Sequence, residues 1–431
     1  MSDDARPDTL GEWLQFIERQ HPDPIALGLD RVARVRDALG LAPGFPIFTV
    51  GGTNGKGSVC AMLEAILHCA GYRVGRYTSP HLLRYNERVR VARTDARDGE
   101  LAEEFAAVER ARRDVPLTYF EYGTLAGVRL FVERRVDVAV LEVGLGGRLD
   151  AVNVFDPDCA VVTTVDIDHV DFLGGDREAI GREKAGIFRA GRPAVCADSA
   201  PPSSLIQRAA EIGAQLTRIG VDFGAVPQGR QWQYWGPRGR RSALPYPALR
   251  GASQLANAAA AIAALESMRE RVPVTVNDIR AGLLQADLPG RFQVLPGRPS
   301  VILDVAHNPQ AARALGASLA AMGGSGRVFA VFAMLRDKDI SGVAAAVKSR
   351  VAHWFIAGLE GARVANVADL RNALRANAVT AVTECGDVPA AYTQACDRAA
   401  ENDRLLVFGS FYTVAAVMAL RERQKGVPGQ R

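Results

Sequence analysis

The sequence predicts an α/β protein in which parallel strands alternate with helices. Two observations support this prediction. Short apolar, β-branched runs recur along the chain, and most of them are followed by apolar residues at helical spacing. One such unit, residues 47–70, has a glycine-rich turn between its strand and its helix. The length of 431 residues exceeds what one hydrophobic core usually serves, so we expect two domains.

Residues 47–70 are expected to form a strand, a phosphate-binding turn and a helix. The turn GGTNGKGS (51–58) has four glycines, which let successive N–H groups face one anion at the positive end of the helix dipole. Lys56 would supply a charge for the β- and γ-phosphates, and Ser58 or Thr53 a hydroxyl for a phosphate or its metal. A glycine between Lys56 and Ser58 departs from the Walker pattern. We therefore predict a nucleotide site here.

The segments around this turn are expected to complete a parallel sheet. The first 42 residues contain two helical segments, the second over about 30–39. Strands are expected over 72–78, 136–143 and 159–165, and helices over 100–113 and in the second half of 115–130. The segment TSPHLLRYNERVRV (78–91) is too irregular for a helix, and it is either a surface loop or a mobile substrate loop.

Three of these strands are expected to end beside the nucleotide turn, and they carry Ser79, Glu142 and His169. A hydroxyl, a carboxylate and one imidazole, completed by water and phosphate oxygens, suit Mg²⁺ or Mn²⁺ better than zinc. Taken singly, each residue has a structural alternative. Ser79 could cap a turn, Glu142 could form an ion pair with an arginine, and His169 could pack in a core. Together they predict a metal site.

The helix expected over 177–188 places Lys184 in its apolar stripe. One interpretation is that the lysine extends its amine to solvent along the helix surface. The other is that the amine is partly desolvated and reacts with CO₂ to form a carbamate that ligates a metal.

The rest of the chain is expected to contain a linker and a second α/β domain. Residues 231–247 (QWQYWGPRGRRSALPYP) predict an exposed hairpin, and Ser253 is expected to cap a helix of small residues in which Asn257 contacts either a nucleotide or the backbone. The Pro- and Gly-containing stretch 288–300 predicts a linker. Beyond it, strands are expected over 301–306, 327–335, 353–358 and 404–410, with Asn308 and Pro309 starting a helix. No GxGxxG motif is present, so a dinucleotide site is not indicated.

Composition excludes several other classes of protein. The net charge of +4 comes from scattered Lys and Arg, which argues against nucleic acid and favours small anionic ligands. No apolar run has membrane-spanning length, the N-terminus lacks a signal-peptide pattern, and the six cysteines form no CxxC pair. We expect a soluble, cytoplasmic monomer without membrane partners, ending in a disordered tail after Arg423.

The ordered motifs of the chain resemble those of the folylpolyglutamate synthase group of the Mur ligase superfamily, in particular its bifunctional bacterial members. They span about residues 10–420 and read GGTNGKGS, TSPHLLRYNERVRV, YFEYGT, LEVGLGGRLDAVN, DIDHVDFLG, REKAGIF, PGRFQ, LDVAHNP, MLRDKD and GSFYTV. The resemblance implies a P-loop-containing Mur-ligase-type domain over 1–290 and a smaller Rossmann-like α/β domain over 291–431. The segment GASQLANA departs from the pattern of many relatives, which have a His two residues before the Leu.

The same resemblance implies an ATP-dependent ligase that adds L-glutamate to dihydropteroate and to reduced folates through an acyl phosphate. It implies two Mg²⁺ sites, with Mn²⁺ as an alternative. The implied catalytic residues are Lys56, His169 and Lys184, and the implied metal ligands are Ser79, Glu142, His169 and carbamylated Lys184. The implied ATP contacts are Gly52, Thr53, Asn54, Gly55, Lys56, Gly57, Ser58, Asn257, Arg291, Asp304 and His307. The implied dihydropteroate contacts are Leu27, Gly28, Leu29, Asp30, Thr118, Tyr119, Phe120, Glu121, Leu149, Asp150 and Ala151.

Three alternatives remain open from the sequence. One is a folylpolyglutamate synthase without the dihydropteroate activity. Another is a cell-wall Mur ligase, although only about fifty residues precede the glycine-rich turn, where those enzymes usually carry a longer domain. The last is a P-loop kinase or nucleotide-gated binding protein without a ligase step.

Overall fold

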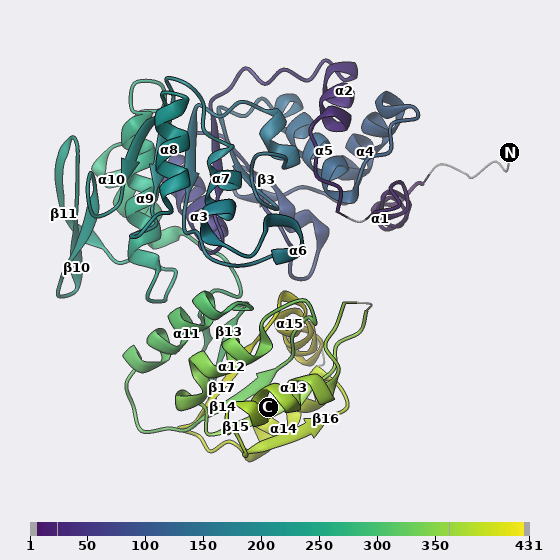
Figure 1. The fold of residues 1–431 in the computed structure, drawn as a ribbon, viewed down its shortest axis with the longest axis vertical. Helices are drawn as coiled ribbons and strands as arrows, with labels where there is room; N and C mark the ends of the chain where they lie inside the picture. The colour runs from purple at the N-terminus through teal and green to yellow at the C-terminus, as the bar shows by residue number, and fades with distance from the viewer. Residues whose placement is uncertain (1–6, 24, 362, 426–431) are drawn as a thin grey trace, which may run out of the picture. The chain divides into compact units, whose positions relative to one another are not determined.

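The computed structural model describes residues 7–23, 25–361 and 363–425 and divides the chain into two compact units (Figure 1). The first unit comprises Met1–Ile167, Leu173–Ala248 and Leu255–Asp287. The second comprises Asp168–Phe172, Leu249–Gln254 and Leu288–Arg431. Two short segments that precede residue 288, one of them carrying His169, therefore belong to the unit built mainly from the C-terminal part.

The first unit is built on an eight-stranded sheet in the order β4-β3-β2-β5-β1-β6-β7-β8. The strands from β2 to β8 in this order are parallel, and β3 and β4 add an antiparallel edge. Their bounds are β1 Ile47–Gly51, β2 Val74–Tyr77, β3 Val89–Val91, β4 Thr94–Asp95, β5 Val138–Glu142, β6 Cys159–Val162, β7 Pro193–Cys196 and β8 Gln215–Arg218. The strands predicted before the nucleotide turn and over 72–78, 136–143 and 159–165 are confirmed as β1, β2, β5 and β6. Strand β1 lies in the interior of the sheet, between β5 and β6.

Helices cover this sheet, and Figure 1 shows α1, α2, α4 and α5 gathered at one end of the first unit. The helices are α1 Leu10–Glu18, α2 Asp30–Ala38, α3 Lys56–Cys69, α4 Asp98–Arg112, α5 Tyr119–Glu133, α7 Arg177–Ala185, α8 Ser203–Glu211, α9 Gln254–Ser267 and α10 Val276–Gln285. Capping boxes at Thr9 and Thr118 start α1 and α5, because each hydroxyl accepts a backbone N–H from the first turn. Close packing is visible at Gly75 of β2, where a Cβ would come 2.7 Å from the Phe131 ring of α5.

A three-stranded antiparallel sheet, β11-β10-β9, forms the other end of this unit (Figure 1). Its strands are β9 Gly224–Gln228, β10 Gln231–Gly236 and β11 Gly239–Pro245. The hairpin prediction is confirmed, but the prediction that it is exposed is wrong for one face. Trp232 and Tyr234 are fully buried, and the Tyr234 hydroxyl donates to Glu266 of α9 at 2.9 Å. The alternation of aromatic and polar residues along β10 gives the sheet this buried face.

The second unit has a six-stranded sheet in the order β12-β13-β17-β14-β15-β16. All neighbours are parallel except β12, which is antiparallel to β13. The strands are β12 Gln293–Leu295, β13 Ser300–Asp304, β14 Val328–Phe332, β15 His353–Ala357, β16 Val382–Cys385 and β17 Arg404–Phe408. The predicted linker over 288–300 is thus partly wrong, since Val294 and Leu295 pair with Ile302 and Val301.

The helices of the second unit follow its strands. They are α11 Pro309–Ala321, α12 Ile340–Val347, α13 Val367–Ala376, α14 Val388–Arg398 and α15 Phe411–Lys425, and the short α6 Val170–Leu173 begins in this unit. The predicted start of α11 is confirmed, because the Asn308 side chain accepts from Ala311 N and Pro309 is the first helical residue. The sequence reasoning does not identify α10, α13, α14 and β16.

The predicted disorder after Arg423 is not found for the next two residues, because α15 continues to Lys425. The remaining tail, like the first six residues in which a signal peptide would begin, lies outside the described residues. Among the described residues, no helix combines the length and the apolar character needed to cross a membrane.

Candidate functional site

The turn between β1 and α3 depends on two glycines. Gly52 and Gly55 have φ angles of 138° and 95°, which L side chains rarely adopt. A Cβ on Gly52 would overlap the Thr163 hydroxyl, and one on Gly55 would come 2.7 Å from Asn257 Oδ1. The backbone of the turn therefore lies directly against two other segments, and Asn257 of α9 is beside the last residue before α3.

The segment after β6 holds this turn in place. Thr53 N donates to Thr164 O at 2.7 Å, and Asp166 N donates to Thr53 Oγ1 at 3.0 Å. Asn54 N donates to Thr164 Oγ1 at 3.1 Å, and Thr163 Oγ1 donates to Asn54 O at 2.7 Å. The sequence reasoning misses these threonines, because contacts between segments this far apart in the chain leave no local pattern. Of the two predicted hydroxyls, that of Thr53 is engaged with Asp166.

Lys56 is the first residue of α3, and its side chain folds back over the turn. Its Nζ donates to Gly52 O at 3.1 Å and to Thr53 O at 3.3 Å. Two sources of positive potential therefore meet at this turn. They are the ammonium group of Lys56 and the N-terminus of the 14-residue helix α3. This arrangement suits an anion such as the phosphates of ATP. Ser58, two residues later, is buried in the first turn of α3.

The structure brings together two of the predicted metal ligands. Glu142 is the last residue of β5 and is 4% exposed, and Ser79 follows the neighbouring strand β2. Ser79 N donates to Glu142 Oε2 at 3.2 Å. Carboxylate and hydroxyl oxygens are the hard ligands that Mg²⁺ and Mn²⁺ prefer, so these residues fit such an ion. Across the described ranges, His, Cys, Asp and Glu side chains form no group of three or more that could hold a metal by themselves.

Lys184 lies in α7 and is only 3% exposed, so the interpretation that its amine reaches solvent is wrong. Its helix packs on the glycine-rich bend after β5, since a Cβ on Gly147 would come within 3.2 Å of Lys184 Cα. The carbamate remains a prediction. His169, with φ of 52°, belongs to the second unit, whereas Ser79, Glu142 and Lys184 belong to the first. The grouping of all four ligands therefore also remains a prediction.

The three predicted substrate segments lie together in the first unit. Gly28 N donates to Leu149 O at 3.3 Å, which joins segment 27–30 to segment 149–151. Arg31 Nη2 donates to Glu121 Oε1 at 2.9 Å and to Ala26 O at 2.7 Å, which joins segment 27–30 to segment 118–121. The sequence reasoning misses Arg31, although it directly follows a predicted contact. Its partner is 90 residues away, so the pairing has no local signal.

The two carboxylates in these segments also have structural roles. Glu121 accepts from Thr118 N at 2.8 Å and completes the capping box of α5. Asp150 accepts from Leu145 N at 2.8 Å and Val152 N at 3.0 Å, which shapes the bend after β5. Burial raises the pKa of Asp150 to about 7, although these hydrogen bonds and the charge of Lys56 oppose the shift. Both carboxylates thus order the backbone around them, and their contact with a ligand remains a prediction.

In the second unit, Asp304 lies at the end of β13. Its carboxylate accepts from Phe292 N and from Ala306 N, both at 2.8 Å, and burial raises its pKa. The guanidinium of Arg291 lies 5.0 Å from the centre of the Phe411 ring. The predicted contacts Arg291 and Asp304 are therefore positioned at the same end of this unit's sheet.

A buried ionic cluster surrounds Asp168. Lys338 Nζ lies 2.5 Å from Asp168 Oδ1, His307 Nε2 lies 3.5 Å from Oδ2, and Asn308 Nδ2 donates to Oδ2 at 3.1 Å. Burial alone would raise the pKa of Asp168, but His307, Lys338 and His169 together lower it below its usual range. Sequence reasoning identifies both histidines as site candidates and misses Asp168 and Lys338. Their motifs DIDH and MLRDKD were the available signal.

Comparison with protein families gives two matches. The Mur ligase middle domain matches residues 50–265, and the glutamate ligase domain of Mur ligases matches residues 290–411. The first match contains the turn between β1 and α3, the Ser79–Glu142 pair and Lys184. The second contains Arg291, Asp304 and the aromatic ring of Phe411.

Individual relatives match over nearly the whole chain. The dihydrofolate synthase/folylpolyglutamate synthase of Escherichia coli K12 is 46% identical over 418 residues, which is 96% of each chain. The structure of E. coli FolC in complex with DHPP and ADP has a TM-score of 0.93 at 45% identity, covering 98% of this chain and 99% of that one. A bifunctional folylpolyglutamate synthase/dihydrofolate synthase with Mn, AMPPNP and L-glutamate bound has a TM-score of 0.91 at 45% identity, covering 98% and 100%.

Proposed function

The chain belongs to the folylpolyglutamate synthase group of the Mur ligases, and from this premise we propose how its residues carry out the reaction. It is an ATP-dependent ligase that joins L-glutamate to dihydropteroate, giving dihydrofolate, and to reduced folates, giving polyglutamates. The observation that carries this function is the match over both units to bifunctional relatives whose structures hold ADP, DHPP and L-glutamate. The cell-wall ligase and kinase alternatives have no comparable support.

The chemistry explains why ATP is needed. A carboxylate and an ammonium ion do not form an amide spontaneously in water. The substrate carboxylate oxygen first attacks the γ-phosphorus, which releases ADP and gives an acyl phosphate. The amine of glutamate then attacks the acyl carbon, phosphate leaves, and the nitrogen loses its proton. The protein must hold the reacting groups in line and neutralise the charge on the phosphates.

We propose that the first unit supplies the phosphate site. The backbone N–H groups of residues 52–58 and the ammonium of Lys56 would hold the phosphates, and Asn257 would contact the nucleotide beside Gly55. When bound, Mg²⁺ or Mn²⁺ would neutralise phosphate charge, with Ser79 and Glu142 as ligands of one ion, and His169 and carbamylated Lys184 as ligands of a second.

The remaining predicted contacts complete the proposal. Segments 27–30, 118–121 and 149–151 would bind the dihydropteroate, with aromatic rings for stacking and carboxylates for the pterin nitrogens. In the second unit, Arg291, Asp304 and His307 would contact ATP. We place the functional domain boundary near residue 290, and we propose a cytoplasmic location because the six cysteines are free thiols.

Phosphate release in the presence of ATP and dihydropteroate tests the function. We expect release to require L-glutamate and to be accompanied by one dihydrofolate per phosphate, measured by mass spectrometry. Lys56→Ala should abolish both products, because the phosphates lose their charged partner. Glutamate-independent phosphate release at the same rate, or glutamate consumption without dihydrofolate, would contradict the proposal.

A further inference from the structure

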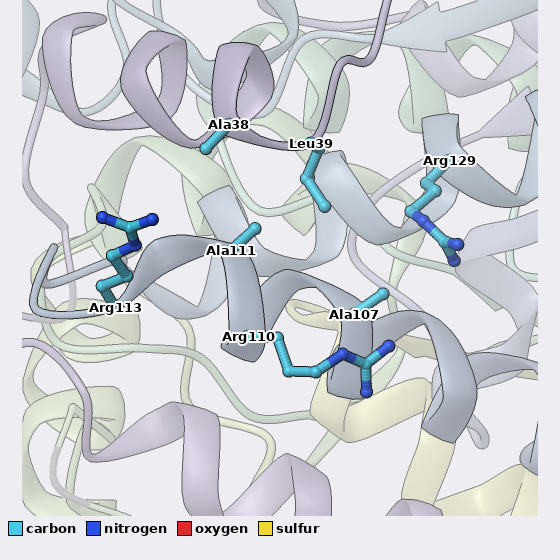
Figure 2. Close-up of a pocket in the computed structure, with 7 residues that line it drawn as sticks. All are labelled: Ala38, Leu39, Ala107, Arg110, Ala111, Arg113 and Arg129. Atoms are coloured by element: carbon cyan, nitrogen blue, oxygen red, sulfur yellow. The ribbon is translucent and has the colours of Figure 1, made fainter.

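A hollow of about 380 Å³ opens in the first unit between the C-terminal ends of α2 and α4 and the middle of α5. Its apolar lining consists of alanines and Leu39, and its charged lining consists of Arg110, Arg113 and Arg129. Figure 2 shows the guanidinium groups of Arg110 and Arg129 on the same side of the hollow, beyond Ala107, and Arg113 beyond Ala111 at the other end. The hollow is thus a small space with cations at both ends and no acidic lining residue.

Two of these cations are available to a ligand. Among the described residues, Arg110 and Arg113 make no hydrogen bond or ion pair through their side chains, and both are exposed. Arg113 ends α4 with φ of 54°, a backbone conformation that costs a non-glycine residue on the order of 1 kcal/mol. The side chain of this residue lines the hollow.

The third cation is partly compensated. Arg129 pairs with Glu104 and Glu133, each at 2.5 Å. Burial and the neighbouring Glu133 raise the pKa of Glu104 to about 8, although Arg129 opposes the shift. A second hollow of about 290 Å³ shares Arg110 and Arg129 but also contains Glu103 and Glu133. An anion is therefore favoured in the first hollow and disfavoured in the second.

We propose that the hollow lined by Arg110, Arg113 and Arg129 is a binding site for a small multivalent oxyanion. Guanidinium groups bind phosphate and carboxylate oxygens through paired N–H donors, and groups at both ends suit a ligand with more than one anionic centre. The alanine side chains leave room for such a ligand, and the volume is at the lower end of the usual range for small-molecule sites, roughly 300–1,000 Å³.

The site would be coupled to the substrate segments through two helices. The first turns of α2 and α5 carry the proposed pterin contacts Asp30 and Tyr119, whereas the hollow is formed by Ala38 at the end of α2 and Arg129 in the third turn of α5. Asp30 and Ala38 are eight positions apart on α2, which corresponds to about 12 Å along the helix axis. An anion held by Arg110 and Arg113 at the end of α4 and by Arg129 of α5 would join α4 to α5 beside α2, and so affect pterin binding.

Two sources of the anion share this chemistry. One is inorganic phosphate, and the other is the row of carboxylates on an oligoglutamyl chain, a source that rests on the proposed function. Calorimetric titration of the full-length protein separates them, with inorganic phosphate and tri-γ-glutamate as probes. The protein is first saturated with a non-hydrolysable ATP analogue and Mg²⁺, so that the nucleotide turn is occupied.

The double variant Arg110→Gln/Arg113→Gln tests the hollow, and the matched control is Arg34→Gln. Arg34 is exposed on α2, makes no side-chain hydrogen bond or ion pair among the described residues and does not line the hollow. We expect saturable binding of at least one probe to the wild type and the control, and binding about tenfold or more weaker in the double variant. Residues 36–40 and 107–114 should gain protection from hydrogen exchange when the probe binds.

Each result decides the proposal. Binding of phosphate alone identifies a phosphate site, and binding of tri-γ-glutamate alone identifies a carboxylate-chain site. Equal affinity of wild type and double variant would overturn the proposal, as would no saturable binding of either probe. Because the assay needs no turnover, these results do not depend on whether the protein forms dihydrofolate. The single variants Arg110→Gln and Arg113→Gln give the same test if the double variant is poorly soluble.

Discussion

Replacing Asp168 by Asn should destabilise the second unit strongly, because it leaves a buried lysine without its counter-ion. The side chains of Asp168 and Lys338 are only 9% and 7% exposed, and their charged atoms lie 2.5 Å apart. At an effective dielectric constant of about 20, their gross attraction is about 7 kcal/mol, most of which offsets the desolvation of both charges. Removing one partner of a buried pair costs about 3–5 kcal/mol. We expect a loss of this size in the free energy of unfolding at pH 7.

The effect should depend on pH in a defined direction. The pKa of Asp168 is lower in the folded protein than its ordinary value of 3.8, so its ionisation stabilises the fold. This stabilisation is fully present above pH 3.8 and is lost as the pH falls toward the folded-state pKa. The difference between wild type and Asp168→Asn should therefore be constant from pH 5 to pH 7 and shrink below about pH 4.

Hydrogen exchange of β13 and β17, which belong to the second unit, measures this stability during urea titration. Asp337→Asn is the control, because Asp337 is exposed and makes no side-chain hydrogen bond or ion pair among the described residues. It should change stability by less than about 0.5 kcal/mol. Lys338→Met and the double variant complete a cycle. The double variant should lose less stability than the sum of the single variants, and additive losses within about 0.5 kcal/mol would refute the pairing.

Three further predictions concern the nucleotide and metal sites. Gly52→Ala should weaken ATP binding about 100-fold or more in a fluorescence titration, because the added Cβ would overlap the Thr163 hydroxyl. The control Gly44→Ala should bind ATP normally, because no atom lies within 4 Å of its added Cβ. Glu142→Gln should raise the Mg²⁺ concentration for half-maximal activity about tenfold or more, and an unchanged titration would remove it from the site. Lys184→Ala should lose activity and regain part of it with small carboxylates. A mass spectrum of the intact native protein without bound CO₂ would count against the carbamate.

Local sequence patterns predicted most of the secondary structure, but they gave little information about which faces of the elements pack against one another. The apolar runs around the nucleotide turn predicted β1, β5 and β6 to within a few residues, because strands buried on both faces need continuous apolar sequence. The same reasoning made residues 231–247 an exposed hairpin. It could not supply the partner of the aromatic face, because Glu266, which accepts a hydrogen bond from Tyr234, is 32 residues away in the chain.

The candidate site shows the same division. Lys56 could be selected from the sequence because the chemistry of phosphate binding limits which residue types serve, and Asp304 because its motif LDVAHNP resembles that of the family. Thr163, Arg31 and Lys338 could not, because each acts through a partner at least 90 residues away in the chain. The sequence also left open whether the Lys184 amine reaches solvent. In the structure α7 packs on the bend at Gly147, and Lys184 is buried.

The sequence by itself determined that this protein has an α/β fold with a glycine-rich turn between β1 and α3, because backbone freedom, β-branched runs and helix caps act over a few residues and are visible in a one-dimensional pattern. That it is a ligase followed from the resemblance of its ordered motifs to a known family. Only the tertiary structure decided which charges meet in the interior, such as Asp168 with Lys338, and which remain without partners at a hollow, such as Arg110 and Arg113. The physical reason is that burial and ion pairing depend on distances between segments, and these are fixed only when the sheets and helices pack.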